Sequence, residues 1–269
     1  MLTDSDLDAC AALLAELATA ATERILVRRP EPHEIATKSS VADWVTETDL
    51  AVERHVRAAV LERFPDHRVV GEEYGTSGSE APAATWYVDP VDGTTNFVHG
   101  LPWSSFSLAV VDDAGPAAAA VVDPYRGECL SAVRGRGAFV DAKPVRCSEA
   151  TTLTGGIVLT ELAAQSLWPG LAELMARLAA TGCVTRIMGS NALALAGVGA
   201  GRAAATVLGA FGAVDCIAGT LIAREAGATV RSRSGAAWPQ PGEGFFCAAP
   251  GVADELATMW SGVEDGARA

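Results

Sequence analysis

The segment from Trp86 to Phe97 constrains this chain most, because an apolar, strand-like run there breaks into a polar cluster. The run breaks at Pro90 and presents two carboxylates three residues apart, Asp89 and Asp92, followed by a glycine and two threonines. Carboxylate and carbonyl oxygens suit Mg²⁺, and N–H groups at a helix start suit phosphate oxygens. The segment therefore indicates a site where a hard cation meets a phosphate. Taken alone, two such aspartates are more often part of a loop that carries an N-capping residue.

Charge and composition narrow the class of partner. The 269 residues are 49% apolar and 20% charged, as in ordinary globular proteins, and can form one large domain or two small ones. A formal net charge of −13 argues against nucleic acid, because binding its phosphates needs clustered Lys and Arg. An acidic protein that acts on an anionic phosphate ester needs metal ions to reverse the local field.

The six cysteines and the hydropathy pattern bear on location. The cysteines are scattered without a Cys-x-x-Cys pair, which favours neither a zinc site nor a disulfide framework. No apolar run reaches the length of a membrane span, and no charged-then-apolar leader opens the chain. We therefore expect a cytoplasmic protein that does not bind a membrane.

The N-terminal half predicts two helices and then a mainly antiparallel sheet. Apolar residues recur at helical spacing from Thr3 to about Val27, and a valine stripe begins near Thr48 and ends at Pro65. Residues 28–40 and 76–84 are expected to be loops. A short strand is expected at residues 68–73, and further strands with hairpin-like separators at 106–111, 117–122, 128–133 and 138–140.

The C-terminal half alternates strand and helix patterns, which predicts a second sheet packed with helices. Its expected strands are residues 157–159, 184–187, 204–207, 229–231 and 245–248, and its expected helices are 171–180, 192–200, 213–226 and 252–260. No low-complexity linker separates the halves. We expect residues 1–269 to form one compact unit with subdomains of about 1–150 and 151–269.

Four separated segments supply acidic groups, and each alone has an ordinary structural explanation. They are residues 38–49, 71–73, 89–95 and 214–219. Thr46 to Asp49 fits a capping box at a helix start, and Lys38 fits a solvated loop lysine. Glu72 fits a polar residue that follows a strand. Asp215 fits the first turn of a helix, where the helix dipole favours a carboxylate.

Together, however, the segments resemble the inositol monophosphatase-like family of Mg²⁺-dependent sugar phosphatases, in the same order and at comparable intervals. Asp89-Pro-Val-Asp-Gly-Thr-Thr-Asn-Phe97 resembles the signature of that family, and Gly135-Arg-Gly-Ala-Phe139 and Gly189-Ser190 extend the match over about residues 36–230. The resemblance implies a layered αβαβα fold, an α/β (α+β) class, and a homodimer.

The resemblance also implies a role for each matching residue. Two or three Mg²⁺ ions are expected in the site. Glu72, Asp89 and the Val91 carbonyl would bind the first ion, and Asp89, Asp92 and Asp215 the second. Thr94 and Asp49 would orient a water activated by the first metal, so that Thr94, Asp49 and Glu72 are the catalytic residues. Gly93, Thr94 and Thr95 would bind phosphate through backbone N–H groups, with Lys38 in a neighbouring loop that helps to hold a further, weaker metal.

Two departures from the family pattern affect the expected substrate. Val214 stands where relatives usually carry Trp, and Leu208 stands where relatives that act on inositol phosphate tend to carry an acidic residue. We assign Leu208 to the substrate pocket and expect hydrolysis of a small polyol, sugar or amino-alcohol phosphate monoester. The alternatives are a histidinol-phosphatase, a bisphosphate-nucleotide phosphatase on the same scaffold, or a non-catalytic, metal-binding regulatory relative.

Overall fold

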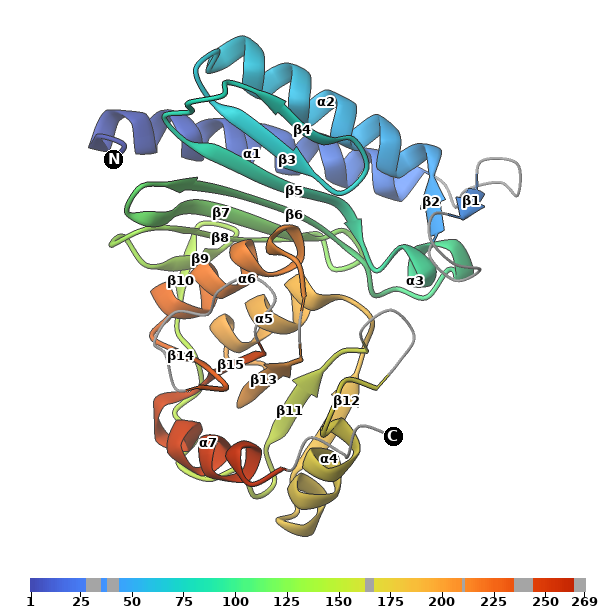
Figure 1. Cartoon of the computed structure of the whole chain (residues 1–269), viewed down its shortest axis with the longest axis vertical. Coiled ribbons are helices and arrows are strands. Elements are labelled where there is room, and N and C mark those ends of the chain that lie inside the picture. Colours follow the sequence, from blue (N-terminus) through green and yellow to red (C-terminus); the bar gives the residue numbers. More distant parts are fainter. Residues whose placement is uncertain (28–34, 38–43, 163–166, 210, 235–243, 264–269) are drawn as a thin grey trace.

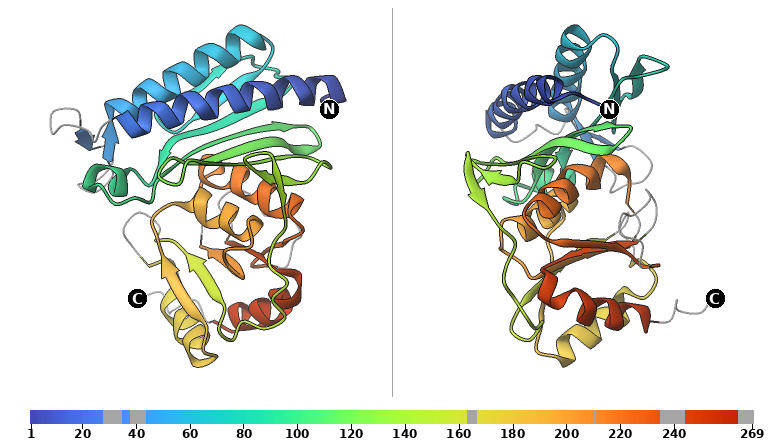
Figure 2. Two further views of the ribbon diagram at one scale, coloured as in Figure 1. Left: turned by 180° about the vertical axis from the view of Figure 1, so that it is seen from behind. Right: turned by 90° about the vertical axis from the view of Figure 1, so that its left-hand side faces the viewer.

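A computed structural model describes residues 1–27, 35–37, 44–162, 167–209, 211–234 and 244–263, arranged as alternating layers of helix and sheet (Figure 1). Helices α1 and α2 cover one face of an eight-stranded sheet, and α5 and α6 lie between that sheet and a five-stranded one. Helices α4 and α7 cover the far face of the smaller sheet, as the two further views in Figure 2 also show. The layer order is αβαβα, which confirms the predicted fold class.

The two N-terminal helices form where the apolar periodicity predicts them. Helix α1 spans Asp4–Val27 and α2 spans Glu47–Arg63. Helix α2 begins with a capping box in which Thr46 and Asp49 satisfy each other's backbone N–H groups. The apolar faces of α1 and α2 pack on the larger sheet in one cluster with Trp86, Phe106 and Leu108.

In the described part of the chain, no helix is long and apolar enough to cross a membrane.

The larger sheet has the strand order β10-β9-β8-β7-β6-β5-β3-β4. All neighbouring strands are antiparallel except β3 and β5, which pair in parallel. The strands are β3 Arg68–Gly71, β4 Gly75–Gly78, β5 Thr85–Asp92, β6 Ser105–Asp112, β7 Gly115–Asp123, β8 Glu128–Val133, β9 Ala138–Val140 and β10 Lys143–Val145.

Two segments that we predicted to be loops contain short strands. Strand β4 lies at the edge of the larger sheet and overlaps the predicted loop 76–84 from Thr76 to Gly78; its glycines and small polar residues hide the strand pattern. Strand β1 (Ile35–Thr37) pairs with β2 (Trp44–Thr46) and falls within the predicted loop 28–40. β1 and β2 form a separate two-stranded sheet, and both this pairing and that of β4 are only three or four residues long, too short to give a readable alternation.

The smaller sheet has the order β12-β11-β13-β15-β14, and its elements match the predicted ones to within two residues. Its strands are β11 Ile157–Thr160, β12 Val184–Ile187, β13 Ala205–Leu208, β14 Thr229–Ser232 and β15 Phe245–Ala248. Its helices are α4 Leu171–Ala180, α5 Asn191–Gly199, α6 Ala213–Glu225 and α7 Ala253–Ser261, with a short 3₁₀ turn, η2, at Pro250–Val252.

Helices α5 and α6 join the two sheets because small residues let them pack closely. A Cβ atom at Gly219 of α6 would lie 2.6 Å from the Leu195 Cβ of α5, so this contact needs glycine. Residues from α5 and α6 pack with Ala109 and Val121 of the larger sheet in one cluster, and with Cys247 of the smaller sheet in another. The division of the chain near residue 150 remains a prediction. It falls between β10 and β11.

Candidate active site

A bulge at the end of β5 brings its two aspartates to one place. In a regular strand, residues three apart point to opposite faces. Asp89 pairs with Ser107 and Asp92 pairs with Ser105, so three steps along β5 oppose two along β6. Pro90 lies in this interval and has no N–H to donate to the neighbouring strand. A bulge is one of the few places in a sheet where proline is tolerated. The Val91 N–H instead donates to Asp89 Oδ1 at 3.1 Å.

Two further carboxylates reach Asp89 from other elements. Glu72 follows β3, and its N–H donates to the Val88 carbonyl of β5 at 3.2 Å. This parallel pairing places the Glu72 carboxyl group close enough to Asp89 to raise the pKa of Asp89. Asp215 lies in the first turn of α6 and accepts a hydrogen bond of 2.9 Å from the Gly212 N–H. It lies close enough to Asp89 to affect its ionisation.

The resulting cluster gathers several acidic side chains around a buried aspartate, Asp89. Asp89 is only 2% exposed, and burial raises its pKa well above the ordinary value, with further contributions from Glu72, Asp92 and Asp215. Among the described residues, no three acidic, Cys or His side chains already form a ready-made metal group. The negative charges nevertheless converge, and a bound divalent cation would relieve their mutual repulsion. The oxygen-only donor set fits Mg²⁺.

Asp92 also joins the two halves of the molecule. Its Oδ2 accepts hydrogen bonds from Ser190 Oγ at 2.6 Å, Ser105 Oγ at 3.3 Å and the Ala192 N–H at 2.7 Å, and its Oδ1 accepts one from the Asn191 N–H at 3.2 Å. Three of these donors belong to the N-terminus of α5, where a carboxylate is favourable. Burial outweighs these bonds and raises the Asp92 pKa to about 6.

Thr94 and Asp49 lie together, as the sequence predicts. Thr94 Oγ1 is 2.9 Å from the Val91 carbonyl oxygen and 3.4 Å from Asp49 Oδ1, so its proton can be donated to either acceptor. Asp49 is completely buried. Its Oδ2 accepts the Thr46 N–H at 2.8 Å and also the Thr46 hydroxyl, which fixes the orientation of the carboxylate. Asp49 is therefore part of the capping box of α2 and also the residue that contacts Thr94.

Gly93 permits the turn from β5 into α3 (Thr94–His99). Its φ is +89°, in the left-handed region that favours glycine. A Cβ there would also lie 2.5 Å from the Gly189 carbonyl oxygen, so the β12–α5 loop sits directly against this turn. The N–H groups of Gly93, Thr94 and Thr95 lie at the beginning of α3, where a helix has no acceptor of its own for them.

Leu208 is not where the sequence analysis assigned it. It is completely buried in a cluster that also contains Leu159, Leu195 and Phe245, so it presents no surface to a ligand in this structure. It lies on β13, in the middle of the smaller sheet, where both faces are covered. Val214 is half-buried, and its carbonyl accepts the Ser107 hydroxyl at 3.4 Å. Lys38 lies outside the described residues.

Three polar residues around the site were not predicted. Ser190 appeared in the sequence analysis only as part of a motif, although a Gly-Ser before a helix pattern is a capping signal. Glu161 is buried and accepts the N–H groups of Gly189 at 2.6 Å and Met188 at 3.2 Å; burial raises its pKa to about 7. Glu53 is also buried, within an i, i+4 pair that from sequence alone is typical of a solvated helix face.

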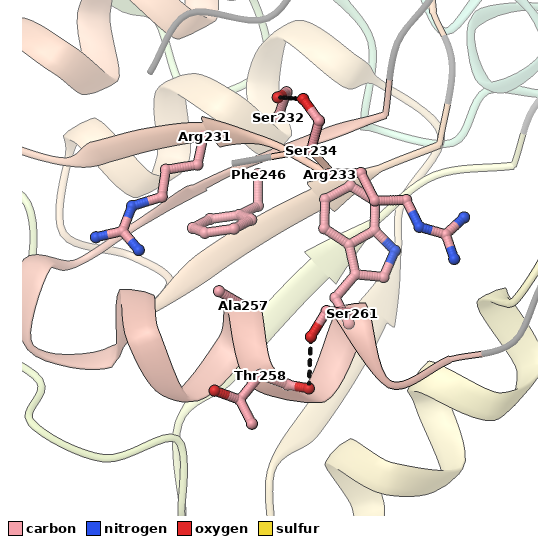
Figure 3. A pocket seen from close by; sticks show the side chains of 9 residues that line it. Arg231, Ser232, Arg233, Ser234, Phe246, Ala257, Thr258 and Ser261 are labelled. Carbon is pink, nitrogen blue, oxygen red and sulfur yellow. Dashed lines mark hydrogen bonds between the residues drawn. The ribbon is translucent and has the colours of Figure 1, made fainter. Parts of the chain in front are cut away.

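A separate cavity of about 340 Å³ lies over β14, β15 and α7 and shares no residue with the carboxylate cluster (Figure 3). Its two arginines already have partners. Arg231 pairs with Asp254 at 2.7 Å, and Arg233 donates to the Val263 carbonyl at 2.9 Å. We therefore place the candidate active site at the carboxylates.

The fold and this site define a layered α/β protein with a buried acidic centre suited to divalent cations. The model of the inositol monophosphatase family matches residues 6–261, so the chain belongs to the inositol monophosphatase family. It is 34% identical over 233 residues to inositol monophosphatase 2 of Homo sapiens, covering 84% of this chain and 81% of that protein. It is also 34% identical over 222 residues to Nus factor SuhB of Pasteurella multocida, covering 82% and 83% respectively.

A solved structure, the IMPase of Thermotoga maritima, superposes with a TM-score of 0.84 at 30% identity, covering 96% of this chain and 98% of that one. The resemblance inferred from the sequence is thus confirmed at the level of family and fold. Membership supports phosphatase activity.

Proposed function

We propose that this protein hydrolyses a small phosphate monoester, of a polyol, sugar or amino alcohol, with Mg²⁺ as cofactor. One observation carries the proposal. Glu72, Asp92 and Asp215, from three separate elements, converge electrostatically on the buried Asp89. A protein gains nothing in stability from gathering like charges in its interior. Such clusters are characteristic of functional sites.

The donor set suggests how the ions are held. Glu72, Asp89 and the Val91 carbonyl would bind one Mg²⁺, and Asp89, Asp92 and Asp215 a second, with Asp89 shared. Lewis-acid polarisation of the phosphoryl group and a lowered pKa of the attacking water are the chemistry that Mg²⁺ supplies in such sites. A third, weaker ion remains part of the proposal.

The chain's own residues would orient the water and the phosphate. Thr94 Oγ1 can accept a proton from the water while it donates its own to Asp49, 3.4 Å away. Asp49 is held for this role by its two contacts to Thr46. The N–H groups of Gly93, Thr94 and Thr95 would bind the phosphate oxygens, since helix starts favour anions.

Relatives on this scaffold leave the natural substrate open. Leu208 is removed from the substrate contacts by its burial, so the expected discrimination against inositol phosphate no longer rests on it. Histidinol phosphate and bisphosphate nucleotides remain alternative substrates. The similarity to a protein named Nus factor SuhB supports a regulatory role as the second candidate function.

Phosphate release with and without Mg²⁺ tests the proposal. Purified protein would be assayed against inositol 1-phosphate, several sugar phosphates, histidinol phosphate and a bisphosphate nucleotide, in Mg²⁺ and in chelator. We expect turnover of at least one monoester that chelator abolishes and Mg²⁺ restores. Activity that persists in chelator would contradict the metal mechanism. Mg²⁺ binding without turnover of any substrate would favour the regulatory role.

We also propose that the protein is a cytoplasmic homodimer that binds neither membranes nor nucleic acid. Strand β12 is an edge of the smaller sheet and, with its neighbour β11, exposes Ile157 (39%), Val184 (37%) and Ile187 (39%). An exposed apolar edge strand is otherwise an aggregation hazard. Sedimentation of wild type and Ile187→Lys would test the dimer, with a monomeric variant expected.

A further inference from the structure

Glu53 of α2 lies directly beneath the turn that carries Glu72. Its carboxylate is completely buried, and Oε2 accepts the Glu73 N–H at 2.7 Å while Oε1 accepts the Tyr74 N–H at 3.0 Å. These are the two residues that follow Glu72 in the turn from β3 to β4. Glu53 therefore fixes the backbone on the C-terminal side of Glu72.

The residue on the other side of Glu72 is fitted to the same carboxylate. A Cβ atom at Gly71 would lie 2.1 Å from Glu53 Oε1, which is far inside van der Waals contact. Only glycine leaves room for Glu53 at this point. The Glu72 N–H itself is tied to β5 through the Val88 carbonyl. The position of Glu72 is thus determined by β5 on one side and by Glu53 on the other.

Arg57 completes the arrangement and makes the buried charge tolerable. Its Nε and Nη2 donate to Glu53 Oε1 at 2.8 and 2.6 Å. Nη1 donates to Ser77 Oγ of β4 at 2.5 Å, and Nη2 also contacts the Gly75 carbonyl. A buried carboxylate is costly unless it is paired and hydrogen-bonded, and here it accepts four hydrogen bonds, two from Arg57 and two from backbone N–H groups.

We infer that Glu53 is a positioning residue for cation binding: through Glu73, Tyr74 and Gly71 it holds the Glu72 carboxylate toward Asp89. Groups that orient metal ligands, without touching the ion, typically change metal affinity by about 10–100-fold when they are replaced. The inference rests on the proposed function, because it takes Glu72 as a ligand.

Calorimetric titration of the full chain with MgCl₂ alone tests the inference without a substrate. Glu53→Gln keeps the shape of the side chain but places an amide NH₂ among N–H donors. We expect its Mg²⁺ dissociation constant to rise by about tenfold or more. Val60→Ala is the matched control, since it opens a cavity in the same helix away from the turn. It is expected to lower the melting temperature with an unchanged dissociation constant.

Ser77→Ala is a milder second variant that decides the question if Glu53→Gln does not fold. It removes only the Arg57–Ser77 hydrogen bond and leaves the Arg57 contact to the Gly75 carbonyl, so we expect a smaller loss of Mg²⁺ affinity than for Glu53→Gln. Wild-type affinity in the folded variants would overturn the inference and leave the proposed function intact. Absence of Mg²⁺ binding by the wild type would instead contradict the proposed function.

Discussion

The Ser190 hydroxyl donates a hydrogen bond of 2.6 Å to the Asp92 carboxylate, and so connects residues 98 positions apart in the sequence. Ser190 is the N-cap of α5, and its Oγ also accepts the Leu193 N–H at 3.2 Å. Asp92 belongs to the acidic cluster at the end of β5. The N-terminus of one helix and one member of the candidate metal site are therefore held by the same hydroxyl group.

Ser190→Ala is expected to lower the free energy of unfolding by about 0.5–2 kcal/mol, the usual cost of a lost N-cap. Urea denaturation in chelator would measure this. Ser190→Thr keeps the hydroxyl and should recover most of the loss. Ser261→Ala, at the end of α7, is a control whose hydroxyl donates to the Thr258 carbonyl of its own helix. Equal stability of Ser190→Ala and wild type would contradict the capping role.

Asp89→Asn is expected to abolish turnover and to remove most of the thermal stabilisation by Mg²⁺. The physical reason is that Asp89 is the carboxylate on which the other three converge, so its neutralisation should affect both proposed ion positions. In chelator, the variant should be at least as stable as wild type, because it removes like-charge repulsion from a buried cluster. Melting temperatures with and without MgCl₂ would show both effects.

The matched control for Asp89→Asn is Asp113→Asn, the same chemical change at a side chain that is 94% exposed. It should leave both the turnover and the Mg²⁺-dependent stabilisation at wild-type values. Full turnover of Asp89→Asn would exclude the proposed ligand set.

Thr94→Ala is expected to lower kcat by about 10²–10⁴-fold, the usual value of a positioned proton transfer. Its Mg²⁺ affinity should change much less, because the Val91 carbonyl remains in place when Thr94 loses its hydroxyl. Thr94→Ser restores a hydroxyl at the same atom and should recover most of the rate. Steady-state rates beside MgCl₂ titrations would separate the two effects. A wild-type rate in Thr94→Ala would remove the pair with Asp49 from the mechanism.

The individual helices and strands could be predicted from the sequence because each has a local pattern, whereas the layer order and the acidic ligand set were implied by the resemblance to a family. Helical and strand periodicities gave α4 its bounds and placed most other elements within two residues, and the Asp89 segment resembled a specific signature. Contacts between distant segments had no local signal. Nothing around Glu53 distinguishes a buried carboxylate from a solvated one, and the β4 edge strand is made of glycines and small polar residues.

Leu208 illustrates the opposite error, in which a family position was taken to define an environment. Its assignment to the substrate pocket came from the family pattern, and the strand was predicted to end one residue earlier, at Val207. The strand instead includes Leu208, paired with Phe245, and the core covers it. The position in the sequence alone does not show whether a residue is the last one of a buried strand or the first one of the loop that follows.

Leu208→Glu is therefore expected to destabilise the protein instead of creating a contact to inositol. A carboxylate in a completely buried apolar position has no partner and costs several kcal/mol, or forces the strand to move. Thermal unfolding would show a large loss for Leu208→Glu, and Leu208→Met, a volume-conserving change, should cost less than about 1.5 kcal/mol. A stable Leu208→Glu with selectively improved turnover of inositol 1-phosphate would restore the original assignment.

The stabilisation by Mg²⁺ is expected to depend on pH, because burial raises the pKa values of two proposed ligands, Asp89 and Asp92. Burial raises the pKa of Asp92 to about 6, above the value of about 3.9 for an unfolded chain. Without a cation, the protonated Asp92 carboxyl group stabilises the folded protein below about pH 4. This stabilisation is lost as the pH rises through about 6. Metal ligands must be deprotonated, so Mg²⁺ binds better above this range. Asp112 does not interfere, because Arg134 keeps the pKa of Asp112 below the ordinary value, so that Asp112 stays ionised throughout this range.

The measurement compares two pH values. At one fixed MgCl₂ concentration, the rise in melting temperature should be larger at about pH 7.5 than at about pH 5. Asp92→Asn should reduce this dependence, with the raised pKa of Asp89 responsible for the remainder, while Asp113→Asn should follow wild type. A stabilisation that is constant over this range in wild type would show that protons and Mg²⁺ do not compete at the cluster.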